Sequence, residues 1–349
     1  MNQDINIRLE QAASLIGTRP HDEILKHYLP ELLLPMVDNS FSASGGYPLN
    51  CAVFNLEQGR YLAQMIAYFK YHRRLREMDV ILANELDYGM KRSGNLNISH
   101  EFAKAIGMNY VYGMEFYVRE VDKGQNDHCQ HGNAIFSRYP LSNAKVINLP
   151  VEYEWFHKEG DSRLGTRIAI FAEIAPPEIG RIGLICVHLE NRATPQGRER
   201  QLRYILQCAQ EHFGDIPLLV GGDMNTNTVD GDSPNEMKDL GANPDEAWRR
   251  IGDIPAFEPL MGAAEELGLS YRDCNIFAKT TRRKPTLDGL TTPLNLDWFF
   301  QRGLRCSDPR KVESIFHLQA FEGAPSSVNA FHGQEMSDHD IVLVRCEKA

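Results

Sequence analysis

Short runs of apolar residues, rich in β-branched and aromatic side chains, recur from residue 51 to the end of the chain. Within 166–174, Arg167, Ala169 and Phe171 are expected on one face and the intervening residues on the other, and Arg167 is interpreted as structural. Other runs are apolar throughout, which is typical of strands buried on both faces. The pattern predicts strands at 51–56, 79–86, 110–118, 133–138, 144–149, 166–174, 182–190, 217–225, 295–300, 311–318 and 340–346.

Helical periodicity appears in a few places between these runs. Residues 57–77 carry a stripe of apolar positions with the spacing of an amphipathic helix. Residues 195–213 place apolar side chains on one face, and Thr194 is a suitable N-cap for that helix. A third helix is predicted near 259–267. Many strands with few helices favour two packed sheets with helices outside.

Two segments depart from this pattern. Residues 1–47 predict two helical stretches and a loop, and we interpret them as a helical extension packed on the main domain, residues 48–349. The apolar stretch ELLLP within the extension is too short for a membrane anchor. Residues 226–259 are polar and punctuated by Pro and Gly, which predicts a long loop or insertion. Because strands resume after it, we place no domain boundary there.

Composition narrows the class of protein. The 349 residues are 42% hydrophobic and 24% charged, which is typical of a globular protein and excludes a disordered chain. We find neither a long apolar run nor a basic start followed by an apolar core, so we expect no membrane span and no secretory signal. The seven cysteines form no CxxC pair, which favours reduced thiols and a cytoplasmic location. The formal net charge of −10 argues against a purely electrostatic grip on nucleic acid.

Polar residues with chemical potential stand at or near the ends of the apolar runs. They are Asn55, Glu85, His188, Asp223, Asn225, Asp297, Asp338 and His339. Strand ends hold side chains rigidly and open onto loops, which suits a catalytic site. Each residue alone also has a structural interpretation, such as a surface glutamate, a core histidine or a turn former. Asp297 is the exception, because a carboxylate inside an apolar run is costly unless it is paired. The joint occurrence favours a functional site.

Seven ordered motifs carry a resemblance to a known family. They are NCAVFNLE, ILANELD, HGNAIFSRYPL, ICVHLENR, LLVGGDMNT, LDWFF and MSDHDIVLV. Together, over about residues 48–347, they resemble the endonuclease/exonuclease/phosphatase superfamily, which has the fold of pancreatic deoxyribonuclease. The resemblance implies a four-layered α/β sandwich, with two mixed β-sheets packed face to face and helices outside. It also implies metal-dependent cleavage of a phosphate ester.

A metal site with oxygen ligands follows from this resemblance. Hydrolysis of an anionic phosphate ester needs charge neutralisation and a positioned water. Mg²⁺ suits this role because it takes oxygen ligands and needs only one or two carboxylates, and Mn²⁺ is the alternative. Glu85 is the first candidate ligand and Asp338 the second. Asn55 is expected to bind through its carbonyl or to hold a water on the metal.

The same resemblance implies roles for the other residues. Asp223 would orient or deprotonate the attacking water, and Asn225 would help to hold that water or the phosphate. His188 and His339 would donate hydrogen bonds to the non-bridging phosphate oxygens. Asp297 would accept a hydrogen bond from His339, fixing its tautomer and favouring its protonated form. The acid that protonates the leaving group stays open between a water on the metal and a histidine.

Further residues flank these motifs. The family usually has Gln-Glu where this chain has Asn84-Glu85, which puts the contacts of the shorter amide in question. The run from His128 to His131 offers three metal ligands but no evident fourth, so we interpret it as a loop beside the active site, with Asn133 near the substrate. The basic run at 282–284 is either a solvated loop or a grip on a substrate phosphate through Arg282 and Arg283.

The leading hypothesis is a Mg²⁺- or Mn²⁺-dependent phosphoesterase that hydrolyses a phosphodiester or phosphomonoester. Its substrate is either a small molecule or a nucleic acid. A nuclease would need a basic rim with aromatic side chains; the net charge does not support one, whereas the basic run at 282–284 does. The rival from another class is a catalytically silent binding module, which is disfavoured because all the expected catalytic residues are present.

Overall fold

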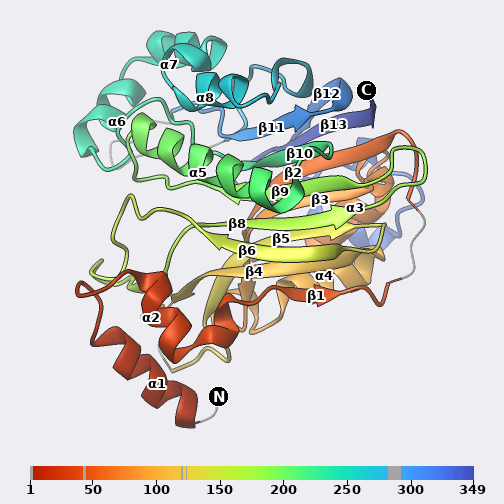
Figure 1. Ribbon diagram of the computed structural model, residues 1–349. Helices are drawn as coiled ribbons and strands as arrows, with labels where there is room; N and C mark the ends of the chain where they lie inside the picture. Colours follow the sequence, from red (N-terminus) through yellow and green to blue (C-terminus); the bar gives the residue numbers. More distant parts are fainter. Residues whose placement is uncertain (1–2, 42–44, 119–120, 123, 282–291) are drawn as a thin grey trace.

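Two β-sheets form the centre of the molecule (Figure 1). The computed structural model describes residues 3–41, 45–118, 121–122, 124–281 and 292–349. The first sheet has the order β1 (Met36–Asp38), β4 (Asn109–Val118), β5 (Gln130–Ser137), β3 (Val80–Tyr88), β2 (Leu49–Gln58), β13 (Ile341–Lys348) and β12 (Leu304–Val312), with β7 (Arg163–Gly165) also paired to β4. The second has the order β11 (Asp297–Arg302), β10 (Leu218–Asp223), β9 (Ile182–His188), β8 (Ile168–Ile174) and β6 (Ser142–Asn148).

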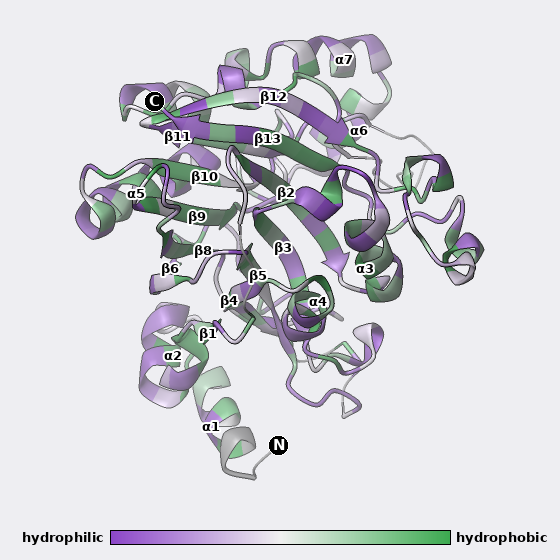
Figure 2. Cartoon of the chain, turned by 90° about the vertical axis from the view of Figure 1, so that its right-hand side faces the viewer, coloured by the Kyte–Doolittle hydropathy of each residue, from purple (hydrophilic) through white to green (hydrophobic). Residues whose placement is uncertain are grey.

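Both sheets are mixed. In the first sheet β2 and β3 are parallel, and in the second β9 and β10 are parallel. The other strand pairs are antiparallel. Figure 2 shows the hydrophobic colouring concentrated on central strands such as β2, β3 and β13. The two sheets pack face to face through these apolar side chains, including Val53 and Leu82 from one sheet and Ile170 and Phe299 from the other.

Helices cover the outer faces of both sheets. Helices α3 (Leu62–Tyr71) and α4 (Ile98–Ile106) pack Met65 and Phe102 against the first sheet. Helices α5 (Pro195–Phe213) and α8 (Leu260–Glu266) pack Leu202 and Leu260 against the second. The four layers confirm the α/β sandwich that the motifs implied.

Two of the predicted helices agree with the structure and one is shorter. Helix α5 begins at the predicted residue, and the side chain of Thr194 caps it by accepting from the backbone N–H of Gly197 at 3.1 Å. Helix α8 falls within 259–267. The helix predicted from residue 57 begins only at Leu62, because Glu57 and Gln58 have positive φ values of 45° and 68° that no α-helix accommodates. It ends at Tyr71, before the 3₁₀ turn Leu75–Glu77.

Two other segments differ in detail from their predictions. Most of the strand expected at 311–318 does not form, because β12 ends at Val312. The apolar residue Phe316 is instead buried in a loop that packs on the first sheet. This loop contains the 3₁₀ turns Leu318–Ala320 and Ser326–Phe331. The long loop or insertion expected at 226–259 contains α6 (Pro234–Gly241), α7 (Pro244–Gly252) and the 3₁₀ turn Ile254–Ala256. Side chains before α6 and α7 cap both helices, so short capped helices replace an irregular loop.

The first 47 residues contribute more than helices. They form α1 (Gln3–Ala13), α2 (His21–Tyr28), the 3₁₀ turn Pro30–Leu33 and β1. Strand β1 pairs with β4 at the edge of the first sheet. Ile24 and Leu25 of α2 are buried, and His21 Nδ1 lies 2.7 Å from the carbonyl oxygen of Gly165. The segment therefore includes an edge strand that was not predicted, and the domain division at residue 48 stays a prediction.

The remaining short elements are the 3₁₀ turns Lys91–Ser93 and Arg272–Cys274. Across the described ranges, the helices are too short or too polar for any of them to cross a lipid bilayer.

Candidate active site

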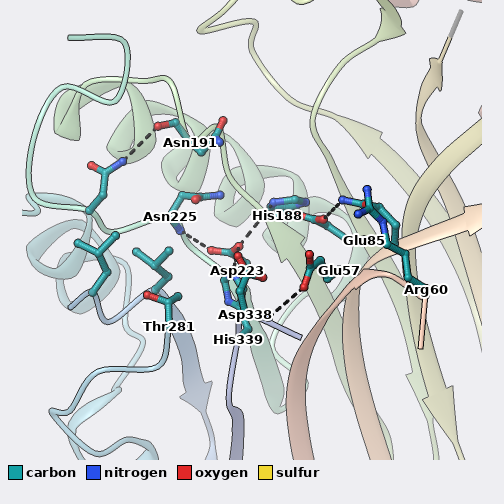
Figure 3. Close-up of a pocket in the computed structure, with 14 residues that line it drawn as sticks. Glu57, Arg60, Glu85, His188, Asn191, Asp223, Asn225, Thr281, Asp338 and His339 are labelled. Atoms are coloured by element: carbon teal, nitrogen blue, oxygen red, sulfur yellow. Dashed lines mark hydrogen bonds and ion pairs between the residues drawn. The ribbon is translucent and has the colours of Figure 1, made fainter. Parts of the chain in front are cut away.

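A polar pocket of about 310 Å³ lies where the ends of both sheets meet (Figure 3). Four carboxylates, two histidines and one arginine line it together with amide and apolar side chains. The lining residues are Glu57, Gln58, Arg60, Glu85, His188, Asn191, Asp223, Asn225, Asn227, Thr281, Leu294, Leu296, Asp338 and His339. The pocket therefore collects most of the residues that the sequence marked as chemical candidates.

The first sheet supplies one wall of the pocket. Parallel strands β2 and β3 carry Asn55 and Glu85 near their C-terminal ends. The pair Asp338-His339 directly precedes β13, which runs antiparallel to β2. The C-terminal end of a strand and the N-terminal end of its antiparallel neighbour lie at the same edge of a sheet. This is why residues almost 300 positions apart in the chain meet here.

The second sheet supplies the opposite wall by the same rule. His188 and Asp223 are register partners at the C-terminal ends of β9 and β10, and Asp297 lies opposite Asp223 at the start of antiparallel β11. Gly222 has a φ of 143°, and a Cβ at this position would collide with the carbonyl oxygen of Val187. The glycine before Asp223 thus allows the close approach of β10 to β9 that sets Asp223 beside His188.

Asp223 lies at the centre of the constellation. Its Oδ2 is 3.7 Å from the Nε2 of His188 and 3.7 Å from the Nε2 of His339. The same oxygen accepts a hydrogen bond from Asn55 Nδ2 at 3.1 Å. Burial raises the pKa of Asp223, as does the nearby Asp297 carboxylate, and the two histidines oppose that rise only in part. The result is a carboxylate more basic than usual between two imidazoles.

His339 is oriented by a carboxylate. Its Nδ1 lies 2.9 Å from Asp297 Oδ2, which also accepts a hydrogen bond from Thr280 Oγ1 at 2.6 Å. Burial by itself lowers the pKa of His339, but the charges of Asp297 and Asp223 outweigh it and hold that pKa well above its usual value. The protonated form of His339 is therefore favoured, and its Nε2 lies on the Asp223 side of the ring.

His188 has a different support. Its Nδ1 lies 3.2 Å from Glu115 Oε2, and Arg167 Nη1 lies 3.0 and 3.1 Å from the two ring nitrogens. Arg167 also donates to Glu190 Oε2 at 3.2 Å, and that oxygen accepts from Trp155 Nε1 at 2.8 Å. All of these side chains are buried. They form a charged network behind His188, between β4 of the first sheet and the segments that flank β8 and β9 of the second.

The charges of this network stabilise one another. Burial raises the pKa of Glu115, but the charges of His188 and Arg167 outweigh it and lower that pKa to about 2. Sequence reasoning missed Glu115 and Glu190 and interpreted Arg167 as structural. One signal was available: Glu115 is the lone acidic residue in the apolar run 109–118, as Asp297 is in its own run.

Glu85 is the strongest candidate for a cation ligand. Its Oε1 accepts from Asn55 Nδ2 at 3.1 Å and its Oε2 from Gln58 Nε2 at 3.3 Å. Burial opposes ionisation, yet the charges of His131 and His188 and the hydrogen bond from Asn55 lower the pKa of Glu85 far below its usual value. An ionised carboxylate that accepts only from neutral amides, with Asp338 in the same pocket, is a donor set that suits Mg²⁺ or Mn²⁺.

Asn55 presents its amide nitrogen to the pocket carboxylates, and its expected role at the metal stays a prediction. Its Oδ1 accepts a hydrogen bond from the backbone N–H of Glu57 at 3.0 Å, so its amide nitrogen faces Glu85 and Asp223. A carbonyl ligand would require the opposite orientation. In this structure Asn55 instead joins the candidate metal carboxylate to the candidate general base.

A second possible cation group overlaps the catalytic candidates. Asp223, Asp297 and His339 offer ligand atoms within 4.8 Å of one another. Two of these residues are already engaged, because Asp297 accepts from Thr280 and pairs with His339. The geometry therefore favours a hydrogen-bonded triad for this group and leaves Glu85 as the freer carboxylate.

The Asn84 amide links the two sheets. It donates from Nδ2 to Val187 O at 3.0 Å and to Asn133 Oδ1 at 3.1 Å, and its Oδ1 accepts from the backbone N–H of Asp223 at 2.9 Å. The shorter amide at this position thus spans from β3 to β9 and β10. It holds the backbone of Asp223 directly.

Asn133 is fully buried, and its Oδ1 accepts from Asn84 Nδ2 and from the backbone N–H of Glu85 at 3.3 Å. It does not belong to the pocket lining. The structure thus places Asn133 directly behind Glu85 and outside the pocket lining, and its role near the substrate stays a prediction.

The other predicted residues divide into two groups. Asn225 has a positive φ of 49°, and its Nδ2 donates to Leu189 O at 2.9 Å, so its side chain is held at the edge of the pocket. Arg282 and Arg283 lie outside the described residues. Sequence reasoning missed several lining residues, which come from the end of β2 and from segments outside the named strands: Glu57, Gln58, Arg60, Asn191, Asn227 and Thr281.

The run from His128 to His131 forms contacts beside the pocket. His131 Nδ1 lies 2.9 Å from Asp87 Oδ1, and Asp87 also pairs with Arg92 at 2.7 Å. The ring of His128 stacks on Tyr88 at 4.2 Å. Among the residues that the structure describes, the group around Asp223 is the one cluster with metal-binding spacing, so no zinc site is found in the part of this run that is described.

Comparisons with known proteins identify the family. The model of the endonuclease/exonuclease/phosphatase family matches residues 49–309, which is most of the chain. The chain therefore belongs to this family. This finding agrees with the motifs that led to the resemblance.

The individual relatives match either a smaller part of the chain or the fold at low sequence identity. The uncharacterized protein YbhP of Escherichia coli K12 is 31% identical over 127 residues, which is 36% of this chain and 44% of YbhP. The match thus spans less than half of that relative. The endonuclease/exonuclease/phosphatase structure from Beutenbergia cavernae aligns over 86% of this chain and 72% of its own, with a TM-score of 0.51 and 14% identity. One from Bacteroides vulgatus aligns over 86% and 99%, with a TM-score of 0.50 and 14% identity. At this identity the two structures support the shared fold alone.

Proposed function

We propose that this protein is a divalent-metal-dependent hydrolase that cleaves a phosphodiester or phosphomonoester by attack of water on phosphorus. One observation carries the proposal. Asp223 Oδ2 lies 3.7 Å from two histidines in the pocket that also holds the ionised Glu85. A general base, two hydrogen-bond donors and a cation ligand are the groups that phosphate hydrolysis needs.

The cation would be held by Glu85, with Asp338 as the second carboxylate of the pocket. When bound, it supplies Lewis-acid neutralisation of charge on the phosphate. Asn55 fixes the positions of the Glu85 and Asp223 carboxylates relative to each other, because its Nδ2 donates to both at 3.1 Å. The carboxylate of Glu85 is thereby available to the cation, and the carboxylate of Asp223 is available to the attacking water.

Asp223 serves as the general base in this proposal. Its raised pKa brings it closer to the range in which a carboxylate accepts a proton from an attacking water. Asn225, whose backbone N–H donates to Asp223 Oδ1 at 2.9 Å, orients that carboxylate. Asn84 fixes the backbone of Asp223 from the other side.

The two histidines serve as donors to the phosphate oxygens. Asp297 holds Nδ1 of His339, so Nε2–H of His339 is free to donate into the pocket. Glu115 takes the corresponding place at Nδ1 of His188. Donors that are oriented before the substrate arrives stabilise developing negative charge without reorganisation.

The lining of the pocket favours a small phosphate ester over a polynucleotide. Glu57 and Asp338 add acidic groups to the pocket, Leu294 and Leu296 form an apolar side, and Arg60 is the exposed cation of the described lining. A nucleic-acid groove instead presents an extended basic track. We therefore expect an ester whose phosphate enters the polar end while an apolar group contacts the two leucines. Nucleic-acid cleavage is the alternative outcome of the test.

The test is hydrolysis by the full chain with Mg²⁺ or Mn²⁺ and with a chelator. The substrates are bis(p-nitrophenyl) phosphate, p-nitrophenyl phosphate, and single- and double-stranded DNA. We expect turnover of a nitrophenyl ester that depends on the cation. Cleavage of DNA with little turnover of both small esters would favour the nuclease instead.

Variants separate catalysis from folding. Asp223→Asn and His339→Gln should lose hydrolysis while keeping the wild-type circular dichroism spectrum. Asp215→Asn, an exposed carboxylate before the other end of β10, is the matched control and should keep wild-type rates. Absence of turnover on every ester, together with absence of Mg²⁺ binding by calorimetry, would instead indicate a catalytically silent binding module.

A further inference from the structure

Five of the seven cysteines lie in the apolar core between the sheets, and four of these five form one group. Cys51 comes from β2, Cys346 from β13, Cys306 from β12 and Cys274 from the 3₁₀ turn beside them, and all four are buried. The Sγ atoms of Cys306 and Cys346 are 3.5 Å apart. Cys274 contacts Cys306, and Cys51 contacts Cys346, through their thiols. This row of thiols lies at the opposite end of β13 from His339 and takes no part in the proposed hydrolysis.

The backbone holds Cys306 and Cys346 directly opposite each other. They are register partners in the antiparallel pair β12–β13. Opposite residues in such a pair have Cβ atoms about 4.5–5.5 Å apart, and a disulfide needs about 3.8 Å. The approach required is therefore on the order of 1 Å. Strand β12 is at the edge of its sheet and has a register shift between Ser307 and Arg310, so it can move towards β13 with little disturbance of other strands.

The two thiols differ in access. Cys306 is 9% exposed and Cys346 is fully buried, so a water-sized reagent reaches Cys306 first. Hydrogen bonds from Cys274 and Cys346 lower the pKa of the Cys306 thiol and outweigh its burial. Since the thiolate is the reactive form, Cys306 is the one expected to react and Cys346 the one positioned to resolve the product.

We propose that Cys306 and Cys346 form a site of reversible thiol oxidation, at which a small hydroperoxide closes a disulfide between β12 and β13. The Cys306 thiolate attacks one oxygen of hydrogen peroxide, the O–O bond breaks, and the products are a sulfenic acid and hydroxide, which takes up the thiol proton as water. The sulfur of Cys346 then attacks the sulfenic sulfur. The S–O bond breaks and the hydroxyl leaves with the Cys346 proton as a second water. Two thiols are oxidised and one peroxide is reduced to two waters.

The experiment uses the full chain, fully reduced and then exposed to hydrogen peroxide. Remaining thiols are alkylated in guanidinium, and the protein is digested with trypsin. Cleavage after Arg305, Arg310, Arg345 and Lys348 releases the peptides 306–310 and 346–348. We expect these two peptides to appear joined, with the mass of one disulfide. Free thiols should fall from seven to five and return to seven with dithiothreitol.

Three variants give the controls. Cys129 and Cys208 are half-buried cysteines, and Cys208→Ser should leave the joined peptide unchanged. Cys346→Ser should leave Cys306 as a sulfenic acid that dimedone traps. Cys306→Ser changes the less buried of the two positions and is therefore a second test. It should leave Cys346 reduced. The proposal is overturned if wild-type Cys306 and Cys346 stay as free thiols, if Cys306 is oxidised without the joined peptide, or if the disulfide forms with another cysteine.

Discussion

The two histidines that flank Asp223 are equally distant from it but are held in different ways. His339 pairs through Nδ1 with Asp297, a carboxylate held by Thr280. His188 pairs through Nδ1 with Glu115 and also contacts the buried guanidinium of Arg167. In the first arrangement, His339 itself forms the ion pair with the carboxylate of Asp297. The second shares charge across a network that also contains Glu190 and Trp155.

We call each histidine, together with the side chains that support it, an arm of the site. The difference between the two arms predicts different contributions to activity and to stability. Asp297 pairs with His339 and raises the pKa of that residue, so the loss of Asp297 acts first on the protonation state of His339. Arg167 balances two buried carboxylates, Glu115 and Glu190, so its loss leaves both without their guanidinium partner. The support of His339 is therefore expected to act mainly on catalysis, whereas the support of His188 is expected to contribute to stability as well.

The largest effect is expected where the two arms meet. Asp223→Asn removes the proposed base and should lower kcat on the best phosphate ester by on the order of 10³-fold. Steady-state kinetics measures it, with Asp215→Asn as the control. A loss below tenfold would show that neither histidine arm works through this carboxylate.

The next effect concerns stability. Arg167→Met should lower the free energy of unfolding by about 3–5 kcal/mol, because it strands buried Glu115 and Glu190. Urea denaturation measures this. The matched control is Arg203→Met on α5, whose ion pairs with Glu199 and Glu266 lie at the surface, and which should cost at most about 1 kcal/mol. Equal losses in the two variants would contradict a structural role for the Arg167 network.

The carboxylates of the two arms should differ in their effect on catalysis. Asp297→Asn removes the charge that keeps His339 protonated and should lower kcat by about 10²-fold. Glu115→Gln leaves Arg167 beside His188 and should lower kcat by less. The ratio of the two kcat values is the measurement, and a larger loss in Glu115→Gln would reverse the assignment.

The smallest effect is a pH dependence of stability with opposite signs in the two arms. The pKa of Glu115 is lowered to about 2 from 4.5, so its contribution is complete above pH 4.5 and is lost as the pH falls towards 2. The pKa of His339 is raised above 6.5, so its contribution is complete below pH 6.5 and is lost as the pH rises through its folded pKa.

Urea unfolding across pH checks this. Compared with the wild type, Glu115→Gln should show a flatter acid limb and His339→Gln a flatter alkaline limb. If both variants flattened the same limb, the two histidines would not be held by opposite electrostatic balances.

Much of the site followed from local patterns. Asn55, Glu85, His188, Asp223 and His339 were marked because polar side chains stand where apolar runs end, and the strands of both sheets bring these ends to one edge. Helix α5 was predicted to the residue because its cap, its periodicity and its C-terminal glycine agree. These signals are local, so they survive without knowledge of the fold.

The differences from the predictions share a physical cause. The apolar run at 311–318 has strand composition, but its Phe316 is buried by loop packing and not by a ladder. Asn133 was expected near the substrate, and the structure places it behind Glu85 and outside the pocket lining. In each case a contact distant in sequence decides the outcome, and composition is silent about it.

By itself, the sequence determined most of the strands and helices, the family, and which polar residues stand at strand ends, since propensity and periodicity act over a few neighbouring residues. Only the tertiary structure decided the partners of those residues: Arg167 against Glu115 across 52 positions, Asn84 against Asp223 across 139, and Cys306 against Cys346 across β12 and β13. A charge or a thiol becomes buried and useful only when a partner from elsewhere in the chain meets it, and that meeting depends on how the two sheets pack.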